Sequence, residues 1–232
     1  MTYDRQRDAA MEVVAVTTGA LRRRLRSGRR WTRGDAIRVV VALVVLAVGW
    51  ALARSGVPDW ERRLFRFINT GNGFWYRPLW LIMQLGNVAV AAGAGLIVGA
   101  LLRSWRVCLI AVLTPIAAWY AALPVKEWVG RLRPGDLGLS AVERGGQIHG
   151  LGFVSGHATV AWALATMLAP HLIPRLRPVV YGLAALVGLA RIYVGAHMPL
   201  DVIGGAGLGI LMGEIGRRTE VRLRRSEPAL TP

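Results

Sequence analysis

The sequence carries little charge for its size and has an excess of apolar residues. Only 18% of its 232 residues are charged, whereas 54% are hydrophobic, and the mean hydropathy is +0.42. A soluble domain has about 25% charged and about 45–50% apolar residues. The excess apolar surface therefore needs a solvent other than water, and a lipid bilayer provides one.

Cysteine, lysine and acidic residues are also scarce. The single cysteine, Cys108, lies in an apolar run, so neither an intrachain disulfide nor a cysteine-based metal site can form. Lys126 is the only lysine among 29 basic residues, and 13 acidic residues leave a net charge of +16. The arginines flank apolar stretches instead of gathering in one module. This pattern favours a membrane protein, and we expect no nucleic-acid partner.

Two basic tails enclose the apolar part of the chain. We predict an arginine-rich tail over 1–35, a membrane domain over 36–216 and a second arginine-rich tail over 217–232. The first apolar run starts near residue 37, too late for a cleaved signal peptide, so we expect it to remain as a span.

A spanning helix needs about 20 mainly apolar residues. The segment 54–77 is mixed, and its tryptophans and arginines predict an interfacial amphipathic helix. Arg191 and Asp201 interrupt the last two apolar stretches, and charges at membrane depth usually mark function. The sequence thus predicts an all-α fold, a bundle of six transmembrane helices near 36–53, 78–102, 107–125, 157–173, 179–195 and 199–215.

Six spans would place both termini on one side of the membrane. In this arrangement 19 of the 29 lysine and arginine residues lie on that side. The positive-inside rule then predicts cytoplasmic termini in a bacterial-type plasma membrane. The loop 126–156 and the turn 195–199 would face outward together.

Three polar stretches lie at the predicted outer ends of the spans. Each alone is a common loop or helix-end pattern, but all three at one membrane depth predict a single site. In chain order they contain Lys126, Arg133 and Pro134, then Ser155, Gly156 and His157, then Arg191, His197 and Asp201.

These residue types suit phosphate chemistry, which depends on positioning and charge neutralisation. Arg133 and Arg191 can each offer a planar fork to phosphate oxygens, and Lys126 offers a point charge. Ser155 and Gly156 precede a helix whose N-terminal N–H groups and dipole attract anions. We therefore predict a phosphate-binding site.

A histidine and an aspartate complete the predicted site. His197 and Asp201 are four residues apart, and Pro199 between them suits a first helical turn. Asp201 can hold one ring nitrogen of His197 and leave the other free to attack, as in an activated nucleophile. His157 is a natural proton donor to the leaving oxygen.

The three stretches resemble the signature motifs of the type 2 phosphatidic acid phosphatase (lipid phosphate phosphatase) superfamily, in its bacterial integral membrane branch. That pattern reads Lys-x6-Arg-Pro, then Pro-Ser-Gly-His, then Ser-Arg-x5-His-x3-Asp. The sequence departs from it at Val154, where proline is usual, and at Ala190, where serine is usual. Neither position supplies a nucleophile, an acid or a charge, so we expect tuning of rate or substrate preference.

The resemblance implies a helical core like that of acid phosphatases and vanadium haloperoxidases, with no metal and no cofactor. It also implies roles for the motif residues. His197 would form a phosphohistidine, Asp201 would orient it, and His157 would act as general acid. The implied phosphate-binding residues are Lys126, Arg133, Ser155, Gly156 and Arg191.

The sequence leaves three functions open. The first is metal-independent hydrolysis of a phosphomonoester or pyrophosphate of a membrane lipid, such as polyprenyl pyrophosphate, phosphatidylglycerol phosphate or phosphatidate. The second is a lipid phosphotransferase that uses the same site. The third is a non-catalytic lipid-binding membrane protein with a decayed site, and retention of every catalytic residue argues against it. The bilayer and a phosphorylated lipid are the expected partners.

Overall fold

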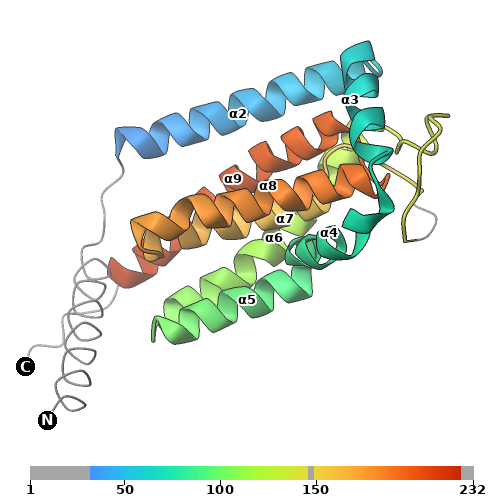
Figure 1. Ribbon diagram of the computed structural model, residues 1–232. Coiled ribbons are helices and arrows are strands. Elements are labelled where there is room, and N and C mark those ends of the chain that lie inside the picture. The colour runs from blue at the N-terminus through green and yellow to red at the C-terminus, as the bar shows by residue number, and fades with distance from the viewer. Residues whose placement is uncertain (1–31, 146–148, 226–232) are drawn as a thin grey trace, which may run out of the picture.

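The chain forms a bundle of helices (Figure 1). The computed structural model describes residues 32–145 and 149–225, and most of these are helical, which confirms the predicted all-α class. Most of the predicted tail 1–35, and the end of the tail 217–232, lie outside the described residues. The elements are α2 (Arg33–Arg54), α3 (Asp59–Asn69), η1 (Gly73–Trp75), α4 (Tyr76–Met83), η2 (Gln84–Gly86), α5 (Val88–Leu101), α6 (Trp105–Val129), α7 (Gly156–Leu168), η3 (Ala169–His171), η4 (Pro174–Leu176), α8 (Arg177–Tyr193) and α9 (Pro199–Arg225).

Among the described residues, four helical segments are long and apolar enough to cross a membrane, namely α2, α6, α8 with the preceding η4, and α9. A fifth crossing is possible where 73–86 and 88–101 meet at a bend of 71°, although one straight span was predicted over 78–102. Asn87 breaks that run, because its side chain accepts a 2.9 Å hydrogen bond from the N–H of Ala89 and starts α5.

The predicted count of six spans is therefore not reproduced by length and composition, which support four or five. The difference lies partly in α7, which has only 13 residues, fewer than a span requires. Eleven of these residues are buried, so α7 is covered by other helices.

Small residues allow α9 to pack closely against α7. A Cβ atom at Gly209 would stand 2.5 Å from the carbonyl oxygen of Thr159, a distance that only a residue without a side chain permits. Gly205 and Gly213, one turn away on either side, make similar approaches to α7. This row of glycines follows the small-residue packing typical of membrane helices.

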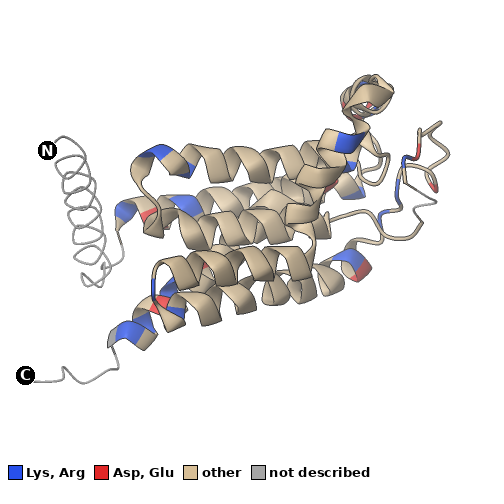
Figure 2. Cartoon of the chain, turned by 60° about the horizontal axis from the view of Figure 1, so that its bottom comes forward, with Lys and Arg blue, Asp and Glu red and all other residues tan. Residues whose placement is uncertain are grey.

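The two ends of the bundle carry the charged residues, and the middle is almost free of them (Figure 2). At the end where α2 begins, Glu214 lies 2.8 Å from Arg38 and 2.7 Å from Arg217, and Arg217 lies 3.1 Å from Asp35. We call these four residues the α2–α9 ion cluster. They hold the start of α2 against α9, and all but Arg38 are buried.

The opposite end is formed by α3 and the long loop between α6 and α7 (Figure 1). The helix α3 lies within the segment 54–77, as predicted, and it is amphipathic. Its residue Phe65 is buried, whereas Phe67 is 80% exposed and is available to a membrane surface. The helix therefore forms part of the scaffold at the end where the motif residues lie.

Candidate active site

All eight predicted site residues lie at the α3 end of the bundle. The last turns of α6 and α8 carry Lys126 and Arg191, and the loop after α6 carries Arg133. The remaining five occupy the start of α7 and the α8–α9 connection with the first turn of α9, namely Ser155, Gly156, His157, His197 and Asp201. Three stretches far apart in the sequence thus meet at one place.

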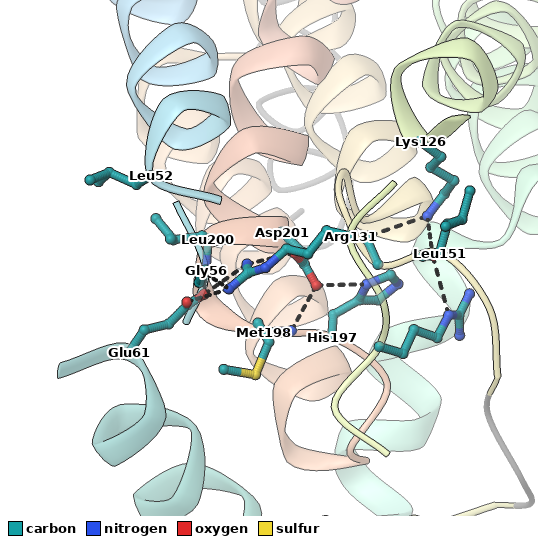
Figure 3. Close-up of polar contacts among 12 residues, drawn as sticks. Leu52, Gly56, Glu61, Lys126, Arg131, Leu151, His197, Met198, Leu200 and Asp201 are labelled. Carbon is teal, nitrogen blue, oxygen red and sulfur yellow. Dashed lines mark hydrogen bonds and ion pairs between the residues drawn. The ribbon is translucent and has the colours of Figure 1, made fainter. Parts of the chain in front are cut away.

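His197 and Asp201 form a buried pair at the centre of this place (Figure 3). Their exposed fractions are 2% and 0%. Nδ1 of His197 lies 3.4 Å from Oδ2 of Asp201 without forming a hydrogen bond. Oδ2 also accepts a 2.9 Å hydrogen bond from the N–H of Met198. Catalytic contacts of this kind are often loose without substrate and tighten in the complex.

The short connection between α8 and α9 sets the position of His197. Gly195 has φ +81°, a left-handed conformation that favours glycine, and it ends α8. The N–H groups of Ala196 and His197 both donate to the carbonyl of Arg191, at 3.0 and 3.3 Å. Pro199 then begins α9. Arg191 and His197 are therefore joined by one compact turn.

Three cations surround the imidazole. Nζ of Lys126 and Nε of Arg133 both donate to the carbonyl of Leu151, at 3.0 and 3.3 Å, and Arg191 contacts Sδ of Met83 at 3.3 Å. None of the three cations has a carboxylate within ion-pair distance in the part of the chain that the structure describes. Their charges are therefore available to an anionic ligand.

Burial lowers the pKa of His197 well below its usual value of 6.5. Nearby positive charges lower this pKa further, and the largest contributions come from Arg191, Lys126 and Arg133. The imidazole is therefore neutral at neutral pH, which is the form that a nucleophile requires.

The N-terminus of α7 lies beside this pair. Ser155 is the residue before the helix, and its hydroxyl accepts a long hydrogen bond, 3.5 Å, from the N–H of Ala158. A Cβ atom at Gly156 would stand 2.8 Å from the ring of Trp119, so glycine is required for the observed packing. The ring of His157 meets the same indole edge-on, with centroids 6.4 Å apart. The first N–H groups and the dipole of this helix favour an anion.

Two further residues contact the site but were not predicted. Glu61 of α3 and Arg131 of the long loop form a buried ion pair with an Nη2–Oε2 distance of 2.5 Å, and Arg131 also lies 3.0 Å from Asp201. Arg131 lies inside the interval between Lys126 and Arg133, and that position was its only sequence signal. Glu61 had none, because its partner is distant in the sequence.

The remaining polar candidates lie elsewhere. His149 is on the exposed surface of the loop, where its Nδ1 lies 2.8 Å from Asp136. Val154 and Ala190, the two departures from the family pattern, are fully buried among apolar side chains. Over 32–145 and 149–225, no group of three or more His, Cys, Asp or Glu side chains is placed to hold a metal ion.

The fold and the site together define a helical membrane protein with a buried histidine–aspartate pair beside three cations. Residues 103–224, more than half of the chain, match the PAP2 superfamily, and the chain belongs to this family. The resemblance predicted from the three motifs is thereby confirmed.

Relatives of known name agree with this assignment. The chain is 30% identical to phosphatidylglycerophosphatase B of Bacillus subtilis (strain 168) over 113 residues, or 44% of this chain and 52% of that protein. It thus spans about half the length of this curated relative.

Two crystal structures resemble the fold. Aquifex aeolicus LpxE superimposes with a TM-score of 0.60 and 28% identity, covering 67% of this chain and 93% of that one. The first transmembrane PAP2-type phosphatidylglycerolphosphate phosphatase from Bacillus subtilis superimposes with a TM-score of 0.62 and 22% identity, covering 80% and 98%. At 22% identity, the similarity to the Bacillus subtilis structure shows a shared fold and nothing more.

Proposed function

We propose that the protein is an integral membrane phosphatase that hydrolyses a phosphomonoester or pyrophosphate of a lipid through a phosphohistidine. The observation that carries this proposal is the buried pair of His197 and Asp201, placed among three cations that have no carboxylate partner within residues 32–145 and 149–225. Family membership and the named relatives support the same reaction class.

The first step forms the phosphohistidine. Because Nδ1 of His197 faces Asp201, Nε2 is the nitrogen that attacks phosphorus. The bond between phosphorus and the lipid oxygen breaks, and His157 donates a proton to that oxygen. Asp201 stabilises the positive imidazole ring that results.

Burial and the positive charges of Arg191, Arg133 and Lys126 lower the pKa of His157 to about 3 in the free protein. We propose that His157 takes up this proton when the bound phosphate offsets those charges.

The second step releases phosphate. His157, now neutral, accepts a proton from water, and the water oxygen attacks phosphorus while the bond to Nε2 of His197 breaks. Inorganic phosphate leaves, and both histidines return to their starting states. In both steps Lys126, Arg133 and Arg191 neutralise the equatorial oxygens, together with the α7 N-terminus at Ser155 and Gly156.

The proposed substrates are lipids whose phosphate lies at the outer membrane surface, such as polyprenyl pyrophosphate, phosphatidylglycerol phosphate or phosphatidate. Support for an outward site comes from the charge distribution, since the basic starts of α2, α6 and α8 lie at the other end of the bundle (Figures 1 and 2). We propose cytoplasmic termini for the same reason.

Phosphate release from each of these lipids by the purified protein in detergent tests the activity. We expect turnover of at least one lipid in the presence of EDTA, as metal-independent chemistry requires. His197→Ala should abolish turnover. His149→Ala, which removes an exposed loop histidine, serves as the matched control and should keep full activity. Full activity of His197→Ala would contradict the mechanism, and loss of activity in EDTA would contradict metal independence.

The orientation can be tested with single cysteines introduced into a Cys108→Ser background. Ser140→Cys lies in the long loop at the site end, and Arg175→Cys lies in the turn at the opposite end. A membrane-impermeant maleimide applied to intact cells should label only the first. Labelling of the second alone would reverse the proposed topology.

A further inference from the structure

A continuous chain of buried charges connects α3 to the nucleophile (Figure 3). It runs from Glu61 through Arg131 and Asp201 to His197. The exposed fractions of Glu61 and Asp201 are 0% and that of Arg131 is 6%, so water does not screen these contacts. Neither Glu61 nor Arg131 has a role in the reaction described above.

Arg131 holds both carboxylates with one guanidinium group. Its Nη1 donates to Oε1 of Glu61 at 3.1 Å and to Oδ1 of Asp201 at 3.0 Å, while Nη2 donates to Oε2 of Glu61 at 2.5 Å. Nη2 also reaches the carbonyl of Gly56 at 3.5 Å. A planar fork with fixed donor directions is needed for this arrangement, and lysine cannot replace it.

Glu61 contacts the start of α9 by a second route. Its Oε1 accepts a 2.9 Å hydrogen bond from the N–H of Leu200, the residue directly before Asp201. One glutamate on α3 therefore contacts the backbone of this turn directly and its Asp201 side chain through Arg131. A structural ion pair alone would not require Glu61 to contact both the N–H of the residue before Asp201 and, through Arg131, the Asp201 side chain.

The two oxygens of Asp201 are divided between the two neighbours. Oδ1 accepts from Arg131, and Oδ2 faces Nδ1 of His197 and accepts from Met198. Rotation of this carboxylate would break the contact with Arg131. The guanidinium group thus sets the plane in which Oδ2 meets the imidazole.

We propose that Glu61 and Arg131 are positioning residues for the nucleophile, because they hold Asp201 in the orientation that directs His197 toward the substrate. This inference rests on the proposed phosphatase function. Glu61 has a second effect on Asp201, because its negative charge offsets the positive charge of Arg131. Without that offset, Arg131 would draw Asp201 away from the imidazole ring and weaken its stabilisation of the positive phosphohistidine.

Glu61→Gln tests the proposal, since it removes the charge and preserves the shape. We expect kcat to fall about 10- to 100-fold, the effect typical of small misplacements at a distance from the chemistry. We expect KM to stay within about twofold, because the phosphate-binding cations are untouched. The matched control is Glu214→Gln, which changes a glutamate equally buried against arginine in the α2–α9 ion cluster. It should leave kcat unchanged per folded molecule.

Arg131→Lys is the second variant, and it retains the charge without the fork. It should fold better than a neutral replacement, because it does not leave two buried carboxylates without a cation. We expect a fall in kcat similar to that of Glu61→Gln. In the double variant the losses should not add, because the two residues act as one unit.

A spectroscopic measurement separates this proposal from the proposed function. Ring ¹⁵N signals of His197 can be recorded in histidine-labelled protein and assigned by their absence in His197→Ala. They should shift in Glu61→Gln and stay in place in Glu214→Gln, whether or not the protein turns over a lipid. Unshifted signals in Glu61→Gln would overturn the positioning role. An effect on KM without a fall in kcat would also overturn it, as would a fall in kcat no larger than that of Glu214→Gln. Absence of turnover in the wild-type protein, with the signals shifted, would contradict the phosphatase function alone.

Discussion

The backbone N–H of Ser155 donates a 2.8 Å hydrogen bond to the carbonyl oxygen of Asp201. Both residues are fully buried, so this bond is not exchanged with water. It joins the residue before α7 to the first turn of α9. The anion-binding helix end and the histidine–aspartate pair are therefore held at a fixed separation, and a change in one motif is expected to act on the other.

Gly156→Ala should lower activity by displacing the start of α7. The added Cβ atom would stand 2.8 Å from the ring of Trp119, and overpacking of this kind costs about 1–3 kcal/mol. We expect kcat/KM to fall about 10-fold or more, because the helix end binds phosphate. Phosphate release and thermal unfolding in detergent measure the two effects. Gly182→Ala in α8, where a Cβ atom meets nothing within 4 Å, is the control and should be neutral in both assays. Normal kinetics for Gly156→Ala would show that the start of α7 can shift without consequence.

Asp201→Asn should reduce kcat about 10³- to 10⁴-fold, as expected when a histidine loses its orienting carboxylate. The substitution also removes one of the two carboxylates that Arg131 contacts among the described residues, and Glu61 remains. Single-turnover kinetics should place the loss in formation of the phosphohistidine. Asp136→Asn, in the exposed loop, is the matched control and should behave as wild type. If Asp201→Asn retained more than about a tenth of the wild-type kcat, the proposed role of Asp201 would be wrong.

The acidic limb of the pH profile should report the pKa of His197. Burial and neighbouring positive charges lower this pKa below 6.5, so protonation should inactivate the free enzyme only at acidic pH. Arg133→Gln removes one of these charges and should raise the pKa of His197. The acidic limb of kcat/KM should then move to higher pH.

The position of the limb, not its height, is the measured quantity, because Arg133 is also proposed to bind phosphate. Arg175→Gln, at the opposite end of the bundle, should leave the limb in place. An unmoved limb in Arg133→Gln would mean that the limb belongs to another group, such as the substrate phosphate.

Glu214→Ala should destabilise the fold without changing the chemistry. It removes the carboxylate that contacts Arg38 and Arg217, and breaking a buried ion pair costs about 3–5 kcal/mol. The thermal unfolding temperature in detergent should fall, while kcat per folded molecule stays constant. Glu127→Ala, an exposed residue at the end of α6, should unfold like wild type. Equal unfolding temperatures for both variants would show that the α2–α9 ion cluster contributes little to stability.

Much of the site could be predicted because its residues lie in short motifs. His197 and Asp201 are separated by one turn, and Ser155 immediately precedes α7, so spacing along the chain already places them at helix ends. The roles of these residues in catalysis stay predictions until the variants are measured.

Composition predicted the spans less accurately than the motifs predicted where the site residues lie. An uncharged run over 78–102 predicts one helix, but composition does not reveal that the Asn87 side chain caps a new one. The length of α7 was overestimated for a similar reason, since apolar residues continue past Leu168 while the helix ends there.

The sequence by itself determined that the protein lies in a membrane, that it is helical and that it belongs to a family with three motifs. These properties depend on composition and on neighbours a few residues apart. Only the tertiary structure decided that Glu61 faces Arg131, that Arg131 reaches Asp201, and that α7 is enclosed by the other helices. Such contacts depend on how closely whole helices pack, and close packing is set by pairs of surfaces that no local stretch of sequence contains.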